Sequence, residues 1–103
     1  VLMGADGGVN GGANVHPRLY VDLYEAAAAR DVTRLLELQA RVLELSRGLY
    51  TVGRHASAII KGLKCALSLL GICEGALAEP FHCFKAPERH IIAERLRELG
   101  LLR

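Results

Sequence analysis

Residues 4–17 read Gly-Ala-Asp-Gly-Gly-Val-Asn-Gly-Gly-Ala-Asn-Val-His-Pro and are the most unusual part of the chain. Five glycines and two asparagines fall within eleven residues, and Pro17 closes the stretch. Glycine permits tight turns and close backbone approach, and proline is favoured at the first position of a helix. The stretch therefore predicts one short strand, over about residues 8–13, followed by a tight turn and then a helix.

The rest of the chain predicts about four helices. Apolar side chains recur at spacings of three and four residues over four stretches, which are residues 17–30, 31–50, 55–70 and 87–99. Asp31 offers an N-cap for the second helix, Gly71 a C-terminal cap for the third, and Pro87 a start for the last. Residues 72–86 lack a helical period and predict an ordered loop. The chain is thus expected to be mainly α as it stands.

The composition excludes several classes of function. The net charge of +2 comes from 13 basic and 11 acidic residues that are scattered along the chain, so neither nucleic acid nor a membrane surface is an expected partner. Aromatic residues, at 5%, are too few for a base-stacking platform. No apolar run is long enough to cross a membrane, and no signal peptide is recognisable. We expect a cytoplasmic protein.

The sequence predicts no metal or cofactor site. Cys65, Cys73 and Cys83 have no regular spacing and suit free thiols in a reducing compartment. Neighbouring side chains such as His82 and Cys83 diverge in most backbones, and no Cys-x-x-Cys pair exists. The glycines do not have the spacing of a dinucleotide fingerprint or of a phosphate-binding loop. The histidines show no carboxylate partner at a diagnostic spacing, so none is expected to act as a general base.

The chain resembles the C-terminal part of the dihydrodipicolinate synthase / N-acetylneuraminate lyase family. That family carries a Gly-x-x-Gly-x-Ile/Val segment on its last barrel strand, followed by Asn-Val and a helix, and here Gly4, Gly7 and Val9 precede Asn14-Val15. The landmarks of its helical extension follow in the same order, namely Ile60-Lys61, Ala66-Leu67, Leu70-Gly71-Ile72, Pro80 and Leu99-Gly100-Leu101. The resemblance covers essentially the whole chain and lies in the order of landmarks rather than in one catalytic motif.

The resemblance implies a fragment of a (β/α)₈ TIM barrel. Residues 1–30 would supply the last barrel strand and helix eight, and residues 31–103 the C-terminal helical extension. Family members make or break C–C bonds of pyruvate or another 2-oxo acid through a Schiff base on a lysine of strand six, and a tyrosine near strand five relays the proton. Both residues lie upstream of this sequence, so the chain contains no catalytic residue and is expected to be inactive alone. Lys61 and Lys64 fall on a helix of the extension and are not candidates for that lysine.

Asn10 and Gly11 are the candidate substrate-binding residues. In a TIM barrel the active site lies at the C-terminal mouth, where small residues of strand eight would let a substrate reach the main chain. Several relatives have a serine near Gly11, so their substrate specificity does not transfer to this chain. The alternative is that the glycines serve only close packing of the strand.

Two functions from different classes remain open at this stage. The chain is either the C-terminal piece of a Schiff-base lyase or synthase, or an autonomous short helical module that acts through oligomerisation. A start at Val1 rather than at methionine favours the first. In both cases we expect a homo-oligomer, because the apolar face of the first helix would otherwise stay uncovered.

Overall fold

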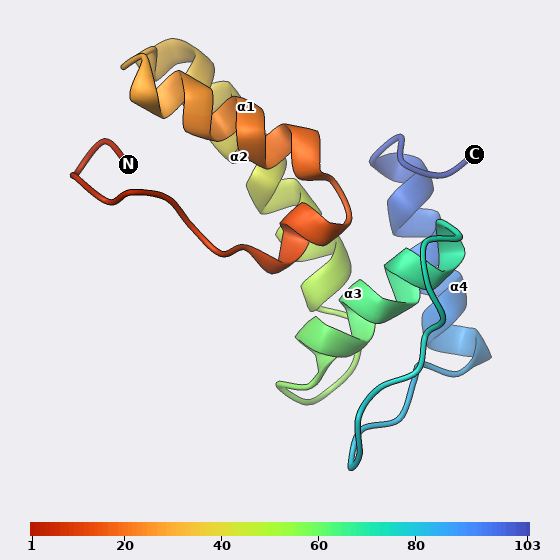
Figure 1. Ribbon diagram of the computed structural model, residues 1–103. Helices are drawn as coiled ribbons and strands as arrows, with labels where there is room; N and C mark the ends of the chain where they lie inside the picture. Colours follow the sequence, from red (N-terminus) through yellow and green to blue (C-terminus); the bar gives the residue numbers. More distant parts are fainter. The chain divides into compact units, whose positions relative to one another are not determined.

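The computed structural model describes residues 1–103 and contains four α-helices and one short 3₁₀ helix (Figure 1). In chain order the elements are η1 (Gly11–Asn14), α1 (Pro17–Ala28), α2 (Val32–Tyr50), α3 (Ala58–Leu69) and α4 (Ala86–Glu98). The chain divides into two compact units, residues 1–44 and residues 45–103, and α2 contributes to both. The prediction of a mainly helical chain is confirmed.

The predicted strand over residues 8–13 is wrong. Residues 5–10 have no regular structure, and residues 11–14 turn into η1, in which the Ala13 amide donates to the Asn10 carbonyl at 3.1 Å. A strand needs a ladder partner, and no neighbouring strand is present for this segment to pair with. Residues 11–14 instead form hydrogen bonds within a tight turn, while residues 5–10 stay exposed to solvent.

Helices α1 and α2 build the core of the first unit, where they lie side by side (Figure 1). The buried side chains are Leu19, Ala26 and Leu38, and the half-buried side chains of Tyr20, Leu23, Leu35 and Val42 pack against them. Leu36 and Leu43, on the other side of α2, stay 62% and 43% exposed. The apolar surface of α2 is therefore only partly covered.

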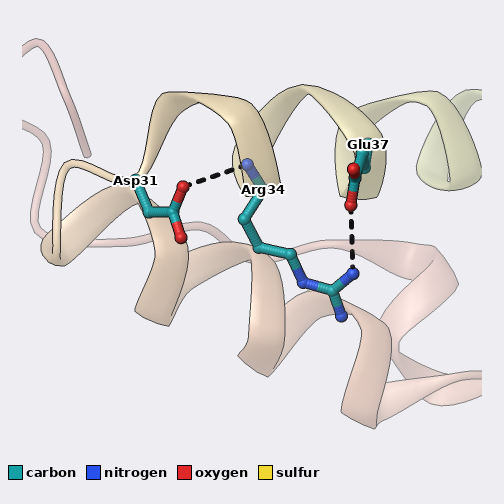
Figure 2. A network of polar contacts seen from close by, with 3 residues as sticks. All are labelled: Asp31, Arg34 and Glu37. Atoms are coloured by element: carbon teal, nitrogen blue, oxygen red, sulfur yellow. Dashed lines mark hydrogen bonds and ion pairs between the residues drawn. The ribbon is translucent and has the colours of Figure 1, made fainter.

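The turn between α1 and α2 fixes how the two helices meet. Arg30 has φ +56°, and the amides of Arg30 and Asp31 donate to the carbonyls of Ala27 and Ala26 at 3.1 and 2.9 Å. This pair of bonds ends α1 in the manner of a Schellman motif, with arginine where glycine is usual. Asp31 then caps α2, because its Oδ1 accepts the Arg34 amide at 3.1 Å (Figure 2). The predicted N-cap is confirmed.

The second unit has a separate core from the end of α2, α3 and α4. Its largest fully buried side chains are Leu45, Leu49, Ile92 and Leu96. Helix α3 meets them with small residues, and a Cβ on Gly62 would overlap the carbonyl oxygen of Leu49. This contact brings α3 against the α2 backbone, so it depends on the absence of a side chain at position 62.

Glycines end α3 and α4. Gly71 and Gly100 have φ +74° and +73°, and the amides that follow them, of Ile72 and Leu101, reach back to the carbonyls of Leu67 and Leu96. The C-terminal cap predicted at Gly71 is confirmed. Helix α3 begins at Ala58 rather than near His55, because His55 accepts the Ala58 amide in a separate turn.

Candidate functional site

Asn10 and Gly11, the predicted substrate-binding pair, lie together at the entry to η1. Both residues are exposed. Asn10 has an extended backbone and its carbonyl accepts the Ala13 amide at 3.1 Å, while the Gly11 carbonyl accepts the Asn14 side-chain amide at 3.0 Å. The Asn10 side chain makes no hydrogen bond of its own, so its amide is available to a ligand.

Gly8 leaves the space that the Asn10 side chain occupies. A Cβ on Gly8 would stand 2.9 Å from Asn10 Nδ2, which is closer than real Cβ atoms come to a neighbour. A side chain at position 8 would therefore push the Asn10 amide away. The orientation of the Asn10 side chain therefore depends on the glycine at position 8.

An apolar groove of about 860 Å³ lies in the first unit, between the N-terminal segment and α1. None of the side chains that line it is an Asp, Glu, Lys or Arg. Asn10 lines the groove and Gly11 does not. The full lining consists of Val1, Leu2, Met3, Ala5, Gly7, Gly8, Asn10, Ala13, Pro17, Tyr20, Val21, Leu23, Tyr24, Ala27, Leu35 and Gln39.

The chemistry of this groove suits an apolar partner better than a charged metabolite. A 2-oxo acid carries a carboxylate, which needs a cation or several hydrogen-bond donors when it is taken out of water. The groove offers few polar groups, and its α1 wall is the helical face of Tyr20, Leu23, Tyr24 and Ala27. Sequence reasoning missed the groove, because its second wall is an irregular segment whose path has no periodic signal.

Relatives of known name match nearly the whole chain. A 4-hydroxy-tetrahydrodipicolinate synthase of Methylobacterium radiotolerans is 37% identical over 99 residues, covering 96% of this chain and 31% of the relative. One of Methanopyrus kandleri is 31% identical over 102 residues, covering 99% of this chain and 32% of the relative. The solved structure of dihydrodipicolinate synthase from Bacteroides thetaiotaomicron is 54% identical with a TM-score of 0.91, over 94% of this chain and 33% of that protein. The chain is thus similar to the C-terminal part of dihydrodipicolinate synthases.

The chain spans about a third of the length of the curated relatives it matches. No protein-family model matches it. The resemblance to the C-terminal part of the dihydrodipicolinate synthase family, stated from the order of landmarks, is confirmed by these relatives. The helical chain accordingly matches a fragment of a TIM-barrel enzyme. None of its residues forms a β-strand.

The two lysines that might be mistaken for a Schiff-base lysine lie on α3. Lys61 and Lys64 are half-buried, and Lys64 Nζ lies 3.9 Å from Cys73 Sγ in an exposed contact. Neither lysine lines the groove or lies in the unit that holds Asn10. Both lysines lie in a helix, as the spacing of apolar residues over residues 55–70 predicted.

All three cysteines are free thiols. Cys65 is buried on α3, and burial raises the pKa of its thiol, while the nearby Arg89 guanidinium partly opposes that rise. Cys73 and Cys83 are exposed. No three His, Cys, Asp or Glu side chains lie close enough together to hold a metal ion.

One histidine has a carboxylate partner that sequence reasoning missed. His90 Nε2 lies 3.3 Å from Glu94 Oε1 on the exposed face of α4. The two residues are four apart, a spacing that places side chains together on a helix, so the pair could have been read from the sequence. Both side chains are more than half exposed and neither lines the groove of the first unit, so the pair is a surface contact.

Helix α4 carries two further polar features. Arg89 Nη1 donates to Ser68 Oγ of α3 at 3.0 Å, and Glu88 Oε2 is buried without a hydrogen-bond partner. Glu88 lies in the first turn of α4, where the helix dipole favours a negative charge. The hydrogen bond between Arg89 and Ser68 links α3 to α4. None of the four helices is sufficiently long and apolar to span a bilayer.

Proposed function

We propose that this chain is the C-terminal part of a Schiff-base enzyme that makes or breaks a C–C bond of pyruvate or another 2-oxo acid. The observation that carries the proposal is the 54% identity and TM-score of 0.91 to dihydrodipicolinate synthase of Bacteroides thetaiotaomicron. The named relatives among curated proteins, called 4-hydroxy-tetrahydrodipicolinate synthase, support the same activity. No cofactor is needed, because the lysine imine itself serves as the electron sink.

Within that enzyme, residues 1–30 would supply the last barrel strand and helix eight, and residues 31–103 the helical extension. The extended backbone of Asn10 and the helix that starts at Pro17 support this division. In a closed barrel, residues 5–10 would gain strand partners on both sides, which the isolated chain does not supply. The segment would then become the strand that the chain alone does not form.

The chain alone would be inactive. Lys61 and Lys64 lie on α3, outside the unit that holds Asn10, and no Asp, Glu, His, Lys or Arg side chain lines the groove of the first unit. In the whole enzyme this chain would help to bind the substrate and would supply no catalytic side chain. Asn10 would donate or accept a hydrogen bond at the barrel mouth, and Gly11 would let the substrate approach the main chain.

We further propose a cytoplasmic homo-oligomer. Three free cysteines suit a reducing compartment. Tyr24 and Leu36 leave apolar surface exposed on α1 and α2, of the kind that association covers.

The experiment joins this chain to the part of a relative that it does not match. A chimera carries the other two-thirds of the Bacteroides thetaiotaomicron enzyme in front of Val1, and its synthase activity is compared with that of the chain alone. We expect turnover by the chimera and none by the chain. Asn10→Ala in the chimera should lower kcat/KM about tenfold, the effect of one lost hydrogen bond to the substrate. A folded chimera without activity would contradict the proposal.

A further inference from the structure

The space above Gly8 and the side chain of Asn10 lie on the same side of the N-terminal segment. Residues two apart in an extended chain direct their side chains to one face, and the backbone of Asn10 is extended, with φ −108° and ψ 126°. A Cβ on Gly8 would stand 2.9 Å from Asn10 Nδ2, 3.4 Å from Oδ1 and 3.5 Å from Cγ. Apart from the neighbours of Gly8 in the chain, the three atoms nearest to that Cβ thus all belong to the Asn10 amide group.

The backbone at position 8 would accept a side chain. Gly8 is not among the glycines with positive φ, so alanine can adopt its conformation without strain. The atoms that an added Cβ would meet are at the end of a flexible side chain, which can rotate to another rotamer. A methyl group at position 8 would therefore turn the Asn10 amide and leave the path of the backbone unchanged.

The direction of the Asn10 amide decides what it can bind. Its NH₂ group donates two hydrogen bonds and its oxygen accepts them, so each orientation of the amide presents a different pattern to a ligand. Hydrogen bonds weaken steeply when donor and acceptor are misaligned. A rotated Asn10 would consequently lose a ligand contact even though the residue itself is retained.

We propose that Gly8 is a positioning residue of the substrate site, and that the space it leaves sets the direction in which the Asn10 amide meets the substrate. The proposal rests on the proposed function, in which Asn10 hydrogen-bonds to the substrate of the whole enzyme. The adjacent Gly7 has no such role, because a Cβ there would have no atom within 4 Å. The two neighbouring glycines therefore differ in function.

A double-mutant cycle in the chimera described above tests the proposal. Gly8→Ala should lower kcat/KM about tenfold, as Asn10→Ala does, because the same hydrogen bond is lost. In the Asn10→Ala chimera, Gly8→Ala should cost less than about twofold more, since the side chain that it displaces is absent. Equal losses in the two backgrounds would show a role for Gly8 that does not act through Asn10, and would overturn the proposal.

Gly7→Ala is the matched control. Neither Gly7 nor Gly8 has positive φ, so alanine is unstrained at both positions and only the contact with the Asn10 amide distinguishes them. Gly7→Ala should change kcat/KM by less than about twofold. Equal effects of the two substitutions would contradict the proposal, as would a Gly8→Ala chimera that fails to fold, because the group it displaces is free to rotate.

Nuclear magnetic resonance of the chain alone separates this proposal from the proposed function. A nuclear Overhauser effect should join the Gly8 Hα protons to the side-chain NH₂ protons of Asn10. Gly8→Ala should remove it and shift the NH₂ resonances, whereas Gly7→Ala should preserve both. A chimera without synthase activity, together with these spectra, would overturn the proposed function while Gly8 still directs the amide. Unchanged Asn10 resonances in Gly8→Ala would overturn the positioning role, even in an active chimera.

Discussion

Gly62 of α3 lies directly against the main chain of Leu49 in α2, so that a Cβ at position 62 would overlap the Leu49 carbonyl oxygen and stand 3.0 Å from its carbonyl carbon. Both residues are buried. The neighbour is backbone and cannot move aside as a flexible side chain would. The close approach of the two helices in residues 45–103 therefore depends on this glycine.

The first prediction concerns this contact. Gly62→Ala should lower the free energy of unfolding by about 1–3 kcal/mol, because the added methyl group forces the helices apart. Gly48→Ala is the matched control, since Gly48 is also a buried glycine in a helix, and a Cβ there would meet its nearest atom, Arg95 Cβ, at an ordinary 3.7 Å. That variant should gain up to about 1 kcal/mol from helix propensity. Urea unfolding measures both, and effects of the same sign would contradict the account.

The second prediction concerns Arg30, which ends α1 with φ +56°. Arg30→Gly should raise the free energy of unfolding by about 0.5–1 kcal/mol, because glycine adopts this conformation without the Cβ clash. Arg30→Ala keeps the clash and serves as the control, with little expected change. A lower thermal midpoint for Arg30→Gly would show that the arginine side chain makes a contribution not seen in its hydrogen bonds.

The third prediction separates the two interactions drawn in Figure 2. Asp31 Oδ1 caps the Arg34 amide at 3.1 Å, while Arg34 Nη1 pairs with Glu37 Oε2 at 3.3 Å on the exposed surface. Asp31→Ala should lower the free energy of unfolding by about 1 kcal/mol and Asp31→Asn by much less, since asparagine also caps. Glu37→Gln should cost only about 0.3 kcal/mol, because solvent screens the ion pair. Thermal unfolding in low and high salt is the measurement, and the cost of Glu37→Gln should shrink in high salt, where the ion pair is screened.

The helices could be predicted from the sequence because their signals are local. Spacings of three and four residues, the Asp31 cap and the cap at Gly71 identify each helix from a short window. The strand prediction failed because residues 11–14 can form a 3₁₀ turn with hydrogen bonds inside the segment. A strand would have needed a second strand to pair with, and the chain contains none. The groove depends on the path of residues 1–10 relative to α1, which no local pattern encodes.

The fourth prediction concerns the thiols. Cys73 and Cys83 are exposed and should react quickly with a maleimide or with a disulfide reagent, whereas Cys65 should react at least about tenfold more slowly. Burial raises the pKa of the Cys65 thiol in the folded protein, so less thiolate is present at a given pH. The folded state also holds that proton more tightly than the unfolded state. The free energy of unfolding should therefore fall as pH rises past the pKa of the unfolded thiol.

Mass spectrometry of the alkylated protein distinguishes the three sites. In urea all three cysteines should react at similar rates, which is the control for intrinsic reactivity. A folded protein in which Cys65 reacts as fast as the other two would mean that α3 opens far more readily than its packing indicates.

Trapping with pyruvate and borohydride tests directly whether the enzyme forms a Schiff base between a lysine and pyruvate. The imine formed between a lysine amine and the pyruvate carbonyl is reduced to a stable secondary amine, and peptide mapping then identifies the lysine. The chimera should carry one adduct, on a lysine of the barrel portion upstream of Val1, and the chain alone should carry none. Lys61→Ala and Lys64→Ala should leave that adduct unchanged. An adduct on Lys61 or Lys64, or a folded chimera that traps no pyruvate, would contradict the assignment of this chain to a Schiff-base enzyme.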